Sequence, residues 1–365
     1  MRVVLAPDSF KGTITAADAA SALAAGWGDG ADFVMRPMAD GGEGTVAAFA
    51  AAVPGAERMP VTVDGPAGVP VDTTWLLLPP TADAPDGTAV IDLASTSGIE
   101  LLADLRPFDA DSAGFGQAIA AALDHGVARL VLGIGSSAST DGGTGMLRAL
   151  GARFTDAAGR EVPAGARGLS AIATADLTGL RPVPETLVLT DVTNPLTGPR
   201  GAAEVFGPQK GLTDAADRAR TDAGLAALAA LLGLDPATPG AGAAGGVGGA
   251  LVAWGGRLLP GASEVARLIG LAEAIAGADL VITGEGSYDG QSGDGKVPSF
   301  VAGLAADAGV PAAVVAGRIT ADADTSIFSA SVSLTELAGS AEEAMSHTAR
   351  WLRAAGADLA GSFVR

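Results

Sequence analysis

The sequence contains no cysteine and only two histidines, His125 and His347. The missing thiols exclude a disulfide scaffold, a thiolate nucleophile and a thiolate metal site. A histidine base or a multi-histidine metal centre has little support, because 124–126 (Asp-His-Gly) is typical of a helix end and His347 lies in a helical run. Carboxylates are therefore the side chains left for acid–base chemistry.

Aromatic residues and positive charge are also scarce. Aromatics make up 4% of the 365 residues and apolar residues 48%, so the core must be built of Ala, Val, Leu and Ile, which suits parallel strands covered by helices. The formal net charge of −19 argues against nucleic acid and anionic membranes as partners. Any anion site must therefore be made locally, from backbone N–H groups and a few placed cations.

The sequence offers no convincing membrane span or secretory signal. The longest charge-free stretch, 236–256, is dense in Gly and also carries Pro, which makes it a poor membrane helix. The first residues run directly into a strand-like segment, without the apolar core of a signal peptide. We therefore expect a cytoplasmic protein with no membrane partner.

Strand-like and helical patterns alternate at both ends of the chain, whereas 58–80 and 88–93 are β-like without an intervening helix. We expect strands near 2–6, 32–37, 128–134, 186–190, 279–283, 311–316 and 326–334, and helices near 15–27, 44–52, 110–123, 143–150, 214–232, 264–276, 299–308 and 340–355. The alternation predicts an α/β fold in which residues 1–60 and 278–365 form one doubly wound parallel sheet. Residues 61–277 would then form an inserted second α/β domain.

Six glycine-rich loops stand where a strand ends or a helix begins, which is where open α/β sheets bind ligands. They cover 7–12, 40–44, 133–143, 191–195, 207–211 and 284–290. Any one of them could be an ordinary turn, because the chain has 53 glycines. Taken together they predict anion binding, since glycine lets backbone N–H groups turn toward an anion.

The lysines sharpen this prediction. Of 22 basic residues only Lys11, Lys210 and Lys296 are lysines, and each adjoins a glycine in one of these loops or its continuation. A compact, flexible ammonium suits a site beside a phosphate. We expect Lys11 and Lys296 to act on the transferred phosphate and all three lysines to converge on one spot.

Acidic residues in the same loops supply the other half of a phosphoryl-transfer site, which needs Mg²⁺ on oxygen ligands and a carboxylate near the attacking hydroxyl. Asp191 is our candidate base, because it follows a buried-looking strand directly. The candidate metal ligands are Asp40, Glu43, Asp141 and Asp289. The candidate substrate- and nucleotide-binding residues are Asp8, Ser9, Gly41, Gly42, Gly135, Ser136, Ser137, Thr140, Gly142, Asn194, Lys210 and Glu285. Each acid could instead cap a turn, which is the commoner role of Asp in such loops.

Two other motifs need to be weighed. Gly133-x-Gly135-x-x-Ala138 has the outline of a dinucleotide fingerprint, with Asp156 about 20 residues on, and would suit an NAD-dependent dehydrogenase. Gly290-x-x-x-x-Gly295-Lys296 has the outline of a P-loop, but Val297 replaces the required Ser or Thr, so we reject a P-loop and keep Lys296 as a phosphate candidate. A non-catalytic anion-binding sensor could use the same loops without a base or a metal.

Taken in order, the loops resemble the bacterial type I glycerate kinase family. The matching segments are 6–12, 39–45, 133–143, 191–195, 205–211, 242–246 and 283–286, with Asp289, Gln291, Gly295 and Lys296. The resemblance implies a kinase that uses ATP and Mg²⁺ to phosphorylate D-glycerate, with 2-phosphoglycerate as the favoured product. It also implies a discontinuous Rossmann-like domain, an inserted flavodoxin-like domain and a site in the cleft between them. The family pattern has Asn where this chain has Thr140. Whether the protein is a monomer or a homodimer stays open.

Overall fold

The computed structural model describes residues 1–290 and 296–363. The chain forms two compact units, each described separately below. The terminal unit consists of Met1–Asp40, Ala47–Pro54 and Ala262–Arg365, and the inserted unit consists of Gly41–Val46 and Gly55–Gly261. The domain boundaries and the cleft expected from the sequence stay predictions.

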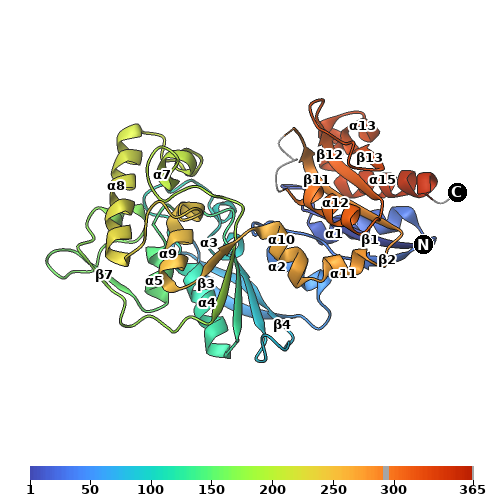
Figure 1. Cartoon of the computed structure of the whole chain (residues 1–365). Coiled ribbons are helices and arrows are strands. Elements are labelled where there is room, and N and C mark those ends of the chain that lie inside the picture. The colour runs from blue at the N-terminus through green and yellow to red at the C-terminus, as the bar shows by residue number, and fades with distance from the viewer. Residues whose placement is uncertain (291–295, 364–365) are drawn as a thin grey trace. The chain divides into compact units, whose positions relative to one another are not determined.

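The terminal unit is built on a five-stranded, all-parallel sheet in the order β13-β12-β11-β1-β2. Its strands are β1 (Arg2–Pro7), β2 (Asp32–Met35), β11 (Leu280–Tyr288), β12 (Ala312–Ile319) and β13 (Ala330–Ser333). Its helices, with most of α2 (Thr45–Ala52) and α10 (Gly261–Leu268), are α1 (Ala16–Trp27), α11 (Leu271–Ile275), α12 (Val297–Asp307), α13 (Leu334–Ala338), α14 (Ala341–Ser346) and α15 (Thr348–Phe363). Figure 1 shows blue β1 beside orange β11, so the two ends of the chain share one sheet.

The order of this sheet corrects one expectation. Counted along the chain within the unit, the strands run 2-1-3-4-5, which is the flavodoxin-like order of doubly wound sheets. The flavodoxin label therefore suits the discontinuous unit, and not the inserted one as the resemblance implied. In this order the connection reverses direction between β1 and β11, where open sheets bind ligands at the carboxyl ends of their strands.

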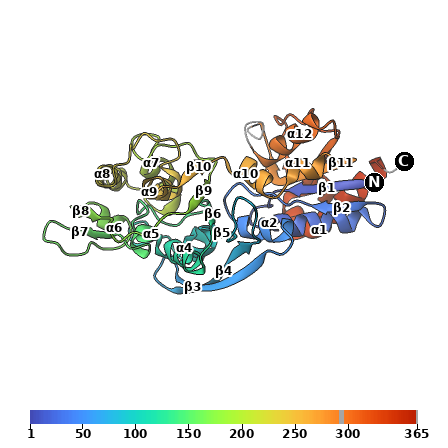
Figure 2. The same ribbon diagram turned by 60° about the horizontal axis from the view of Figure 1, so that its bottom comes forward.

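Both faces of the parallel sheet are covered by helices, which explains why the buried parts of its central strands are mainly apolar. Figure 2 shows α11 and α12 on one side of β1 and α1 on the other. Helix α1 packs against α15, and two glycines permit the close approach. A Cβ on Gly26 would lie 1.9 Å from the Arg353 carbonyl oxygen, and a Cβ on Gly356 would lie 2.3 Å from the Leu23 oxygen. The first and the last helix therefore meet backbone to backbone.

The inserted unit contains a six-stranded mixed sheet in the order β10-β9-β6-β5-β4-β3 and a separate hairpin, β7-β8. Its strands are β3 (Glu57–Asp64), β4 (Pro70–Leu78), β5 (Thr88–Asp92), β6 (Arg129–Gly133), β7 (Arg153–Thr155), β8 (Thr174–Asp176), β9 (Glu185–Leu189) and β10 (Arg257–Leu259). Strands β3, β4 and β5, which cover the β-like runs without helices, pair antiparallel, and β5, β6, β9 and β10 pair parallel. The carboxyl ends of the parallel strands share one edge.

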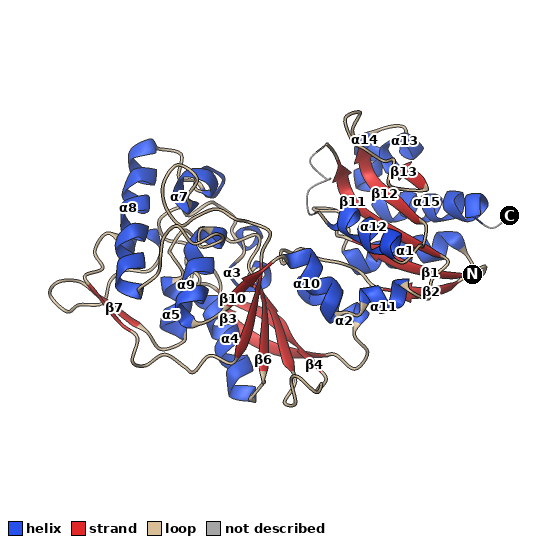
Figure 3. Ribbon diagram, in the orientation of Figure 1, coloured by secondary structure: helices blue, strands red, loops and turns tan. Residues whose placement is uncertain are grey.

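Helices cover this sheet and supply most of the remaining core (Figure 3). They are α3 (Ala94–Ser97), α4 (Ala113–His125), α5 (Thr144–Ala149), α6 (Ala166–Leu169), α7 (Ala202–Phe206), α8 (Ala215–Leu232) and α9 (Val247–Trp254), with 3₁₀ turns at Ile99–Leu101, Pro208–Lys210 and Ala243–Gly246. Helix α4 ends at His125 with Gly126 in the left-handed conformation (φ 92°), which confirms the sequence prediction. Phe115 of α4 and Leu132 of β6 are fully buried in this core.

Three expected elements are shorter or broken. The helix expected over 264–276 is divided at Gly270, whose φ of 67° does not continue a helix. The helix expected over 340–355 is divided at His347, so this histidine ends α14 rather than lying within a helix. The strand expected over 326–334 shrinks to β13. Within the described residues, no helix has both the length and the apolar character that crossing a membrane requires.

Candidate active site

Asp8 marks the carboxyl end of β1 in the terminal unit. Its backbone N–H donates to the Gly284 carbonyl of neighbouring β11 (2.8 Å), and its Oδ1 accepts from the Ser9 N–H (2.7 Å). Burial and the neighbouring carboxylate Asp40 raise the pKa of Asp8 to about 7, and Glu285 of β11 adds to the effect. The sheet therefore gathers three of the predicted acids at its carboxyl edge, where their negative charges repel one another.

Lys11 and Lys296, the two predicted catalytic lysines, belong to the same unit. Lys11 Nζ lies 3.8 Å from Asp40 Oδ2, and its side chain is 72% exposed. Lys296 Nζ lies 3.3 Å from Asp289 Oδ1, with 40% of its side chain exposed. Lys296 immediately precedes α12, whose first turn contains Pro298, so this side chain stands at a helix N-terminus. Both ammonium groups are accessible and close to a predicted metal ligand.

The loop after β6 carries the predicted binding residues of the inserted unit. The Gly135 N–H donates to the Gly41 carbonyl (3.0 Å), and a Cβ on Gly41 would lie 2.5 Å from the Leu189 oxygen at the end of β9. The backbone of Gly42 comes equally close, since a Cβ on Gly135 would lie 2.5 Å from its Cα. The two glycine loops therefore interlock over the carboxyl ends of β6 and β9.

Ser136 is exposed at the crest of the loop and has a φ of 59°, a left-handed conformation uncommon for a residue with a side chain. Gly142 also adopts positive φ (66°), and a side chain there would collide with Leu228. Thr140 is buried, and its Oγ1 has no hydrogen-bond partner within the described part of the chain. The loop thus exposes one hydroxyl and encloses another.

Asp141 is fully buried, and its two carboxylate oxygens accept five hydrogen bonds. The donors are Ser112 N–H (3.1 Å), Ser112 hydroxyl (2.7 Å), Ser139 hydroxyl (2.9 Å), Gly143 N–H (3.1 Å) and Gly145 N–H (3.0 Å). A carboxylate offers about four lone-pair sites, so these donors occupy its capacity. This geometry argues against the predicted metal-ligand role and favours a role in shaping the loop.

Lys210 is buried beneath the same loop, with 3% of its surface exposed. Its Nζ donates to the Ser137 hydroxyl (2.5 Å) and to the Ser139 carbonyl (2.6 Å). Burial lowers the pKa of Lys210 to about 7, although the nearby Asp141 acts in the opposite direction. Lys210 therefore holds the loop from within its own unit, and the convergence of all three lysines stays a prediction.

The loop after β9 contains the candidate base. Asp191 is exposed, and its Oδ1 accepts from the Gly261 N–H (2.8 Å) at the start of α10. Asn194 donates its side-chain N–H to the Arg200 carbonyl (2.7 Å), so it orders its own loop. Glu43 is exposed next to Gly42. Gln291 and Gly295, which belong to the family pattern, lie outside the described residues.

Sequence reasoning missed three polar residues that build this edge. Asp92 ends β5, is 4% exposed, and accepts from the N–H groups of Ser95 (2.9 Å) and Val46 (3.3 Å). Ser112 and Ser139 complete the cage around Asp141. Asp92 carried a usable signal, since it is an acid at the end of a predicted strand, whereas Ser112 is distant from Asp141 in sequence and carried none.

Comparison with known proteins agrees with this geometry. The model of the glycerate kinase family matches residues 3–363. The chain belongs to the glycerate kinase family. It is 40% identical to glycerate 2-kinase of Escherichia coli K12 over 336 residues (88% of this chain, 86% of the relative). It is 39% identical to glycerate kinase of Bacillus subtilis 168 over 379 residues (99% and 97%).

The crystal structure of a putative glycerate kinase 2 from Salmonella typhimurium LT2 has the same fold, with a TM-score of 0.84, 37% identity and coverage of 100% of this chain and 98% of that one. This glycerate kinase family member is thus an enzyme, a phosphotransferase that acts on glycerate, as the resemblance predicted. Membership in a kinase family implies ATP as the donor. Membership in this family gives no support to the dehydrogenase alternative. The Gly133 loop also departs from the dinucleotide-binding pattern, because the next helix begins only at Thr144.

Proposed function

We propose that the protein transfers the γ-phosphoryl group of ATP to the 2-hydroxyl of D-glycerate with the help of Mg²⁺. The observation that carries the proposal is the cluster of carboxylates at the carboxyl edge of the terminal sheet, with Lys11 beside Asp40, in a glycerate kinase family chain. The choice of the 2-hydroxyl is supported by the relative named glycerate 2-kinase. The cytoplasmic location and the choice between monomer and homodimer stay predictions from the sequence.

Asp40 and Asp8 fit a Mg²⁺ ion best among the described residues. They lie close enough for Asp40 to raise the pKa of Asp8, and a divalent cation relieves such repulsion between carboxylates. Protein sites for Mg²⁺ in kinases commonly use one or two carboxylates together with the substrate phosphates. When bound, the ion neutralises negative charge on the phosphates. Asp289, already 3.3 Å from Lys296, is a second candidate ligand.

The side chains of this chain then have distinct tasks. Lys11 and Lys296 stabilise charge on the transferred phosphoryl group, since both ammonium groups are accessible. Asp191 accepts the proton of the attacking hydroxyl, and its bond to the Gly261 N–H orients the carboxylate. The loop around Ser136, held by Lys210 and Asp141, presents hydroxyl and N–H donors to an anion.

The product isomer is the most direct test. Purified protein is incubated with ATP, Mg²⁺ and D-glycerate, and phosphorus NMR resolves 2-phosphoglycerate from 3-phosphoglycerate against standards. We expect the 2-isomer to accumulate in step with ADP. The 3-isomer would refute the assignment of the hydroxyl, and tight ligand binding without ADP would favour the sensor alternative.

Two substitutions test the assigned roles. Lys296→Ala should lower kcat/KM by about 10²-fold or more, on the scale of losing one preorganised electrostatic stabiliser. Asp191→Asn should lower kcat more than it raises KM, because a base acts in the transition state. An unchanged rate for Lys296→Ala would remove that lysine from the site, and the opposite kinetic pattern for Asp191→Asn would make that residue a binding group.

A further inference from the structure

A cavity of about 460 Å³ opens beside α12 in the terminal unit. One wall is the helix itself, through Ala302, Gly303 and Ala306, and the facing wall includes Ile327, a large apolar residue that is 51% exposed. The volume lies within the range of small-molecule sites, roughly 300–1,000 Å³. The cavity therefore combines a size suited to a small ligand with apolar surface left open to solvent.

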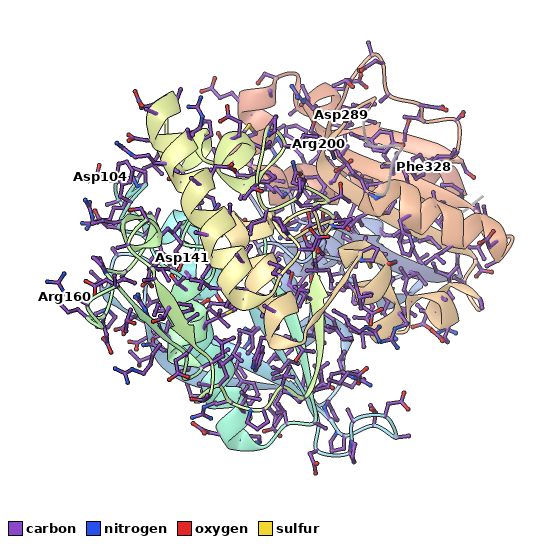
Figure 4. All side chains as sticks on the ribbon, turned by 60° about the vertical axis from the view of Figure 1, so that its left-hand side comes forward. Asp104, Asp141, Arg160, Arg200, Asp289 and Phe328 are labelled. Atoms are coloured by element: carbon purple, nitrogen blue, oxygen red, sulfur yellow. The ribbon has the colours of Figure 1, made fainter. Side chains whose placement is uncertain are left out.

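The walls of this cavity are fixed by internal contacts. The Tyr288 hydroxyl at the end of β11 donates to the Asp324 carbonyl (3.1 Å), which ties the 320–327 segment to the sheet. The Tyr288 ring meets Phe328 edge to face, with 5.7 Å between the ring centres. Figure 4 labels Asp289 and Phe328 on the orange ribbon of this unit. The cavity is a preformed feature of the unit, as ligand sites usually are.

Gly303 leaves open space on the face of α12 that lines the cavity. A Cβ at this position would meet no heavy atom within 4 Å, so packing does not require a glycine here. Glycine within a helix is less stable than alanine. The missing side chain instead flattens the wall of the cavity, which would allow a planar group to lie against the helix.

The polar rim selects the chemistry of the ligand. It includes the carboxylates of Asp289, Asp322 and Asp324, which accept hydrogen bonds and repel anions, and the hydroxyl of Ser299. Glycerate and phosphate groups are therefore disfavoured inside it. A flat ring system with an amino group and sugar hydroxyls matches both the apolar walls and the accepting rim. Lys296 lies 3.3 Å from Asp289 of this rim and offers a cation for an attached phosphate.

We propose that this cavity binds the adenosine part of the phosphoryl donor, with its phosphates directed toward Lys296. The proposal rests on the proposed function, because it identifies where the nucleoside of the same donor lies. It places donor recognition on α12 and the 320–327 segment, which the glycine loops of the sequence analysis did not include.

The experiment fills the cavity and compares the two substrates. Gly303→Leu places an isobutyl group against the open wall, and Gly361→Leu is the matched control, since a Cβ on this α15 glycine also meets no heavy atom within 4 Å. We expect Gly303→Leu to raise the KM for ATP about tenfold or more and to leave the KM for glycerate within about twofold. Gly361→Leu should change neither constant.

A second readout separates binding from folding. Adenosine and inorganic triphosphate are titrated separately by ligand-observed NMR, and Gly303→Leu should lose the adenosine signal while keeping that of triphosphate. Should Gly303→Leu fail to fold, Ile327→Ala removes exposed apolar surface without touching the core and should also weaken adenosine binding. Unchanged adenosine binding and ATP KM in the folded variants would overturn the inference. A wild-type protein that makes no phosphoglycerate would instead refute the proposed function.

Discussion

The chain contains the pattern Asp-Gly-Gly-x-Gly twice, at 40–44 and 141–145, and the two copies have different environments. Asp141 is fully buried and accepts five hydrogen bonds from its own unit. Asp40 keeps 37% of its side chain exposed, and its Oδ2 lies 3.8 Å from the exposed ammonium of Lys11. The same sequence pattern thus supplies a structural anchor in one unit and a chemically available carboxylate in the other.

The neighbouring lysines repeat this contrast. Lys210 is buried and bonded to the loop that contains Asp141, whereas Lys11 is exposed beside Asp40. A buried, hydrogen-bonded charge is costly to remove, while an exposed pair contributes little to stability. Substitutions of Asp141 and Lys210 should therefore affect folding, and those of Asp40 and Lys11 should affect catalysis.

The largest expected effect is that of Asp141→Ala. Removing this carboxylate leaves buried donors unsatisfied and should lower the free energy of unfolding by about 3–5 kcal/mol. Asp40→Ala should lower it by less than about 1 kcal/mol. Urea unfolding of both variants measures the difference. Equal losses of unfolding free energy would show that Asp141 and Asp40 do not differ in their contribution to stability.

Lys210→Met is expected to have a smaller effect on stability. It leaves the Ser139 carbonyl without its donor and should cost about 1–3 kcal/mol, whereas Lys11→Met should stay within about 0.5 kcal/mol of the wild type. Activity should depend more on Lys11 than stability does: Lys11→Met should lower kcat by about 10²-fold despite near-normal folding. A destabilised Lys11→Met with normal activity would break the comparison.

The pH dependence of stability sharpens the same contrast. The pKa of Lys210 is lowered from 10.5 to about 7, so between these values the unfolded chain binds more protons than the folded one. Stability contributed by this group therefore rises with pH across that window, by at most about 1.4 kcal/mol per pH unit. Unfolding experiments at pH 7, 8 and 9 should show this rise in the wild type relative to Lys210→Met. If the free energy of unfolding changed with pH in the same way in both proteins, the Lys210 ammonium would be solvated rather than buried.

The smallest expected effect is that of Thr140→Val. Because the Thr140 Oγ1 is buried without a partner in the described structure, the isosteric change should leave stability the same or raise it by up to about 1 kcal/mol. KM values for ATP and glycerate should decide whether this hydroxyl serves a ligand. A several-fold rise in either KM, with unchanged stability, would assign it to binding.

The sequence predicted the elements well where one pattern dominated. Helix α8 was expected over 214–232 and covers Ala215–Leu232, because Asp214 is an N-cap whose side chain accepts from two backbone N–H groups. The chain was also expected to close one sheet from its two ends, as β1 and β11 do. Long apolar periodicity and strong caps are local, so they can be recognised without tertiary information.

The site was less predictable, since burial decides what a carboxylate or ammonium does. Asp40 and Asp141 look alike in sequence, and the long-range bonds from Ser112 to Asp141 are among the contacts that separate their environments. Lys210 was predicted to bind substrate or nucleotide, and its burial against Ser137 could not be read from the sequence. The cavity at Gly303 combines α12 with the 320–327 segment, a combination that needs the folded structure.

The backbone contact between α1 and α15 has a consequence for the order in which the protein can fold as it is synthesised. Strand β1 cannot pair with β11 until β11, 277 residues later, has been synthesised. Helix α1 likewise cannot pack against α15 until α15 has been made. At the usual elongation rate of 5–20 residues per second, this delay is about 15–55 s. During that interval the inserted unit can complete its own sheet, so β1 is synthesised well before the strand with which it pairs.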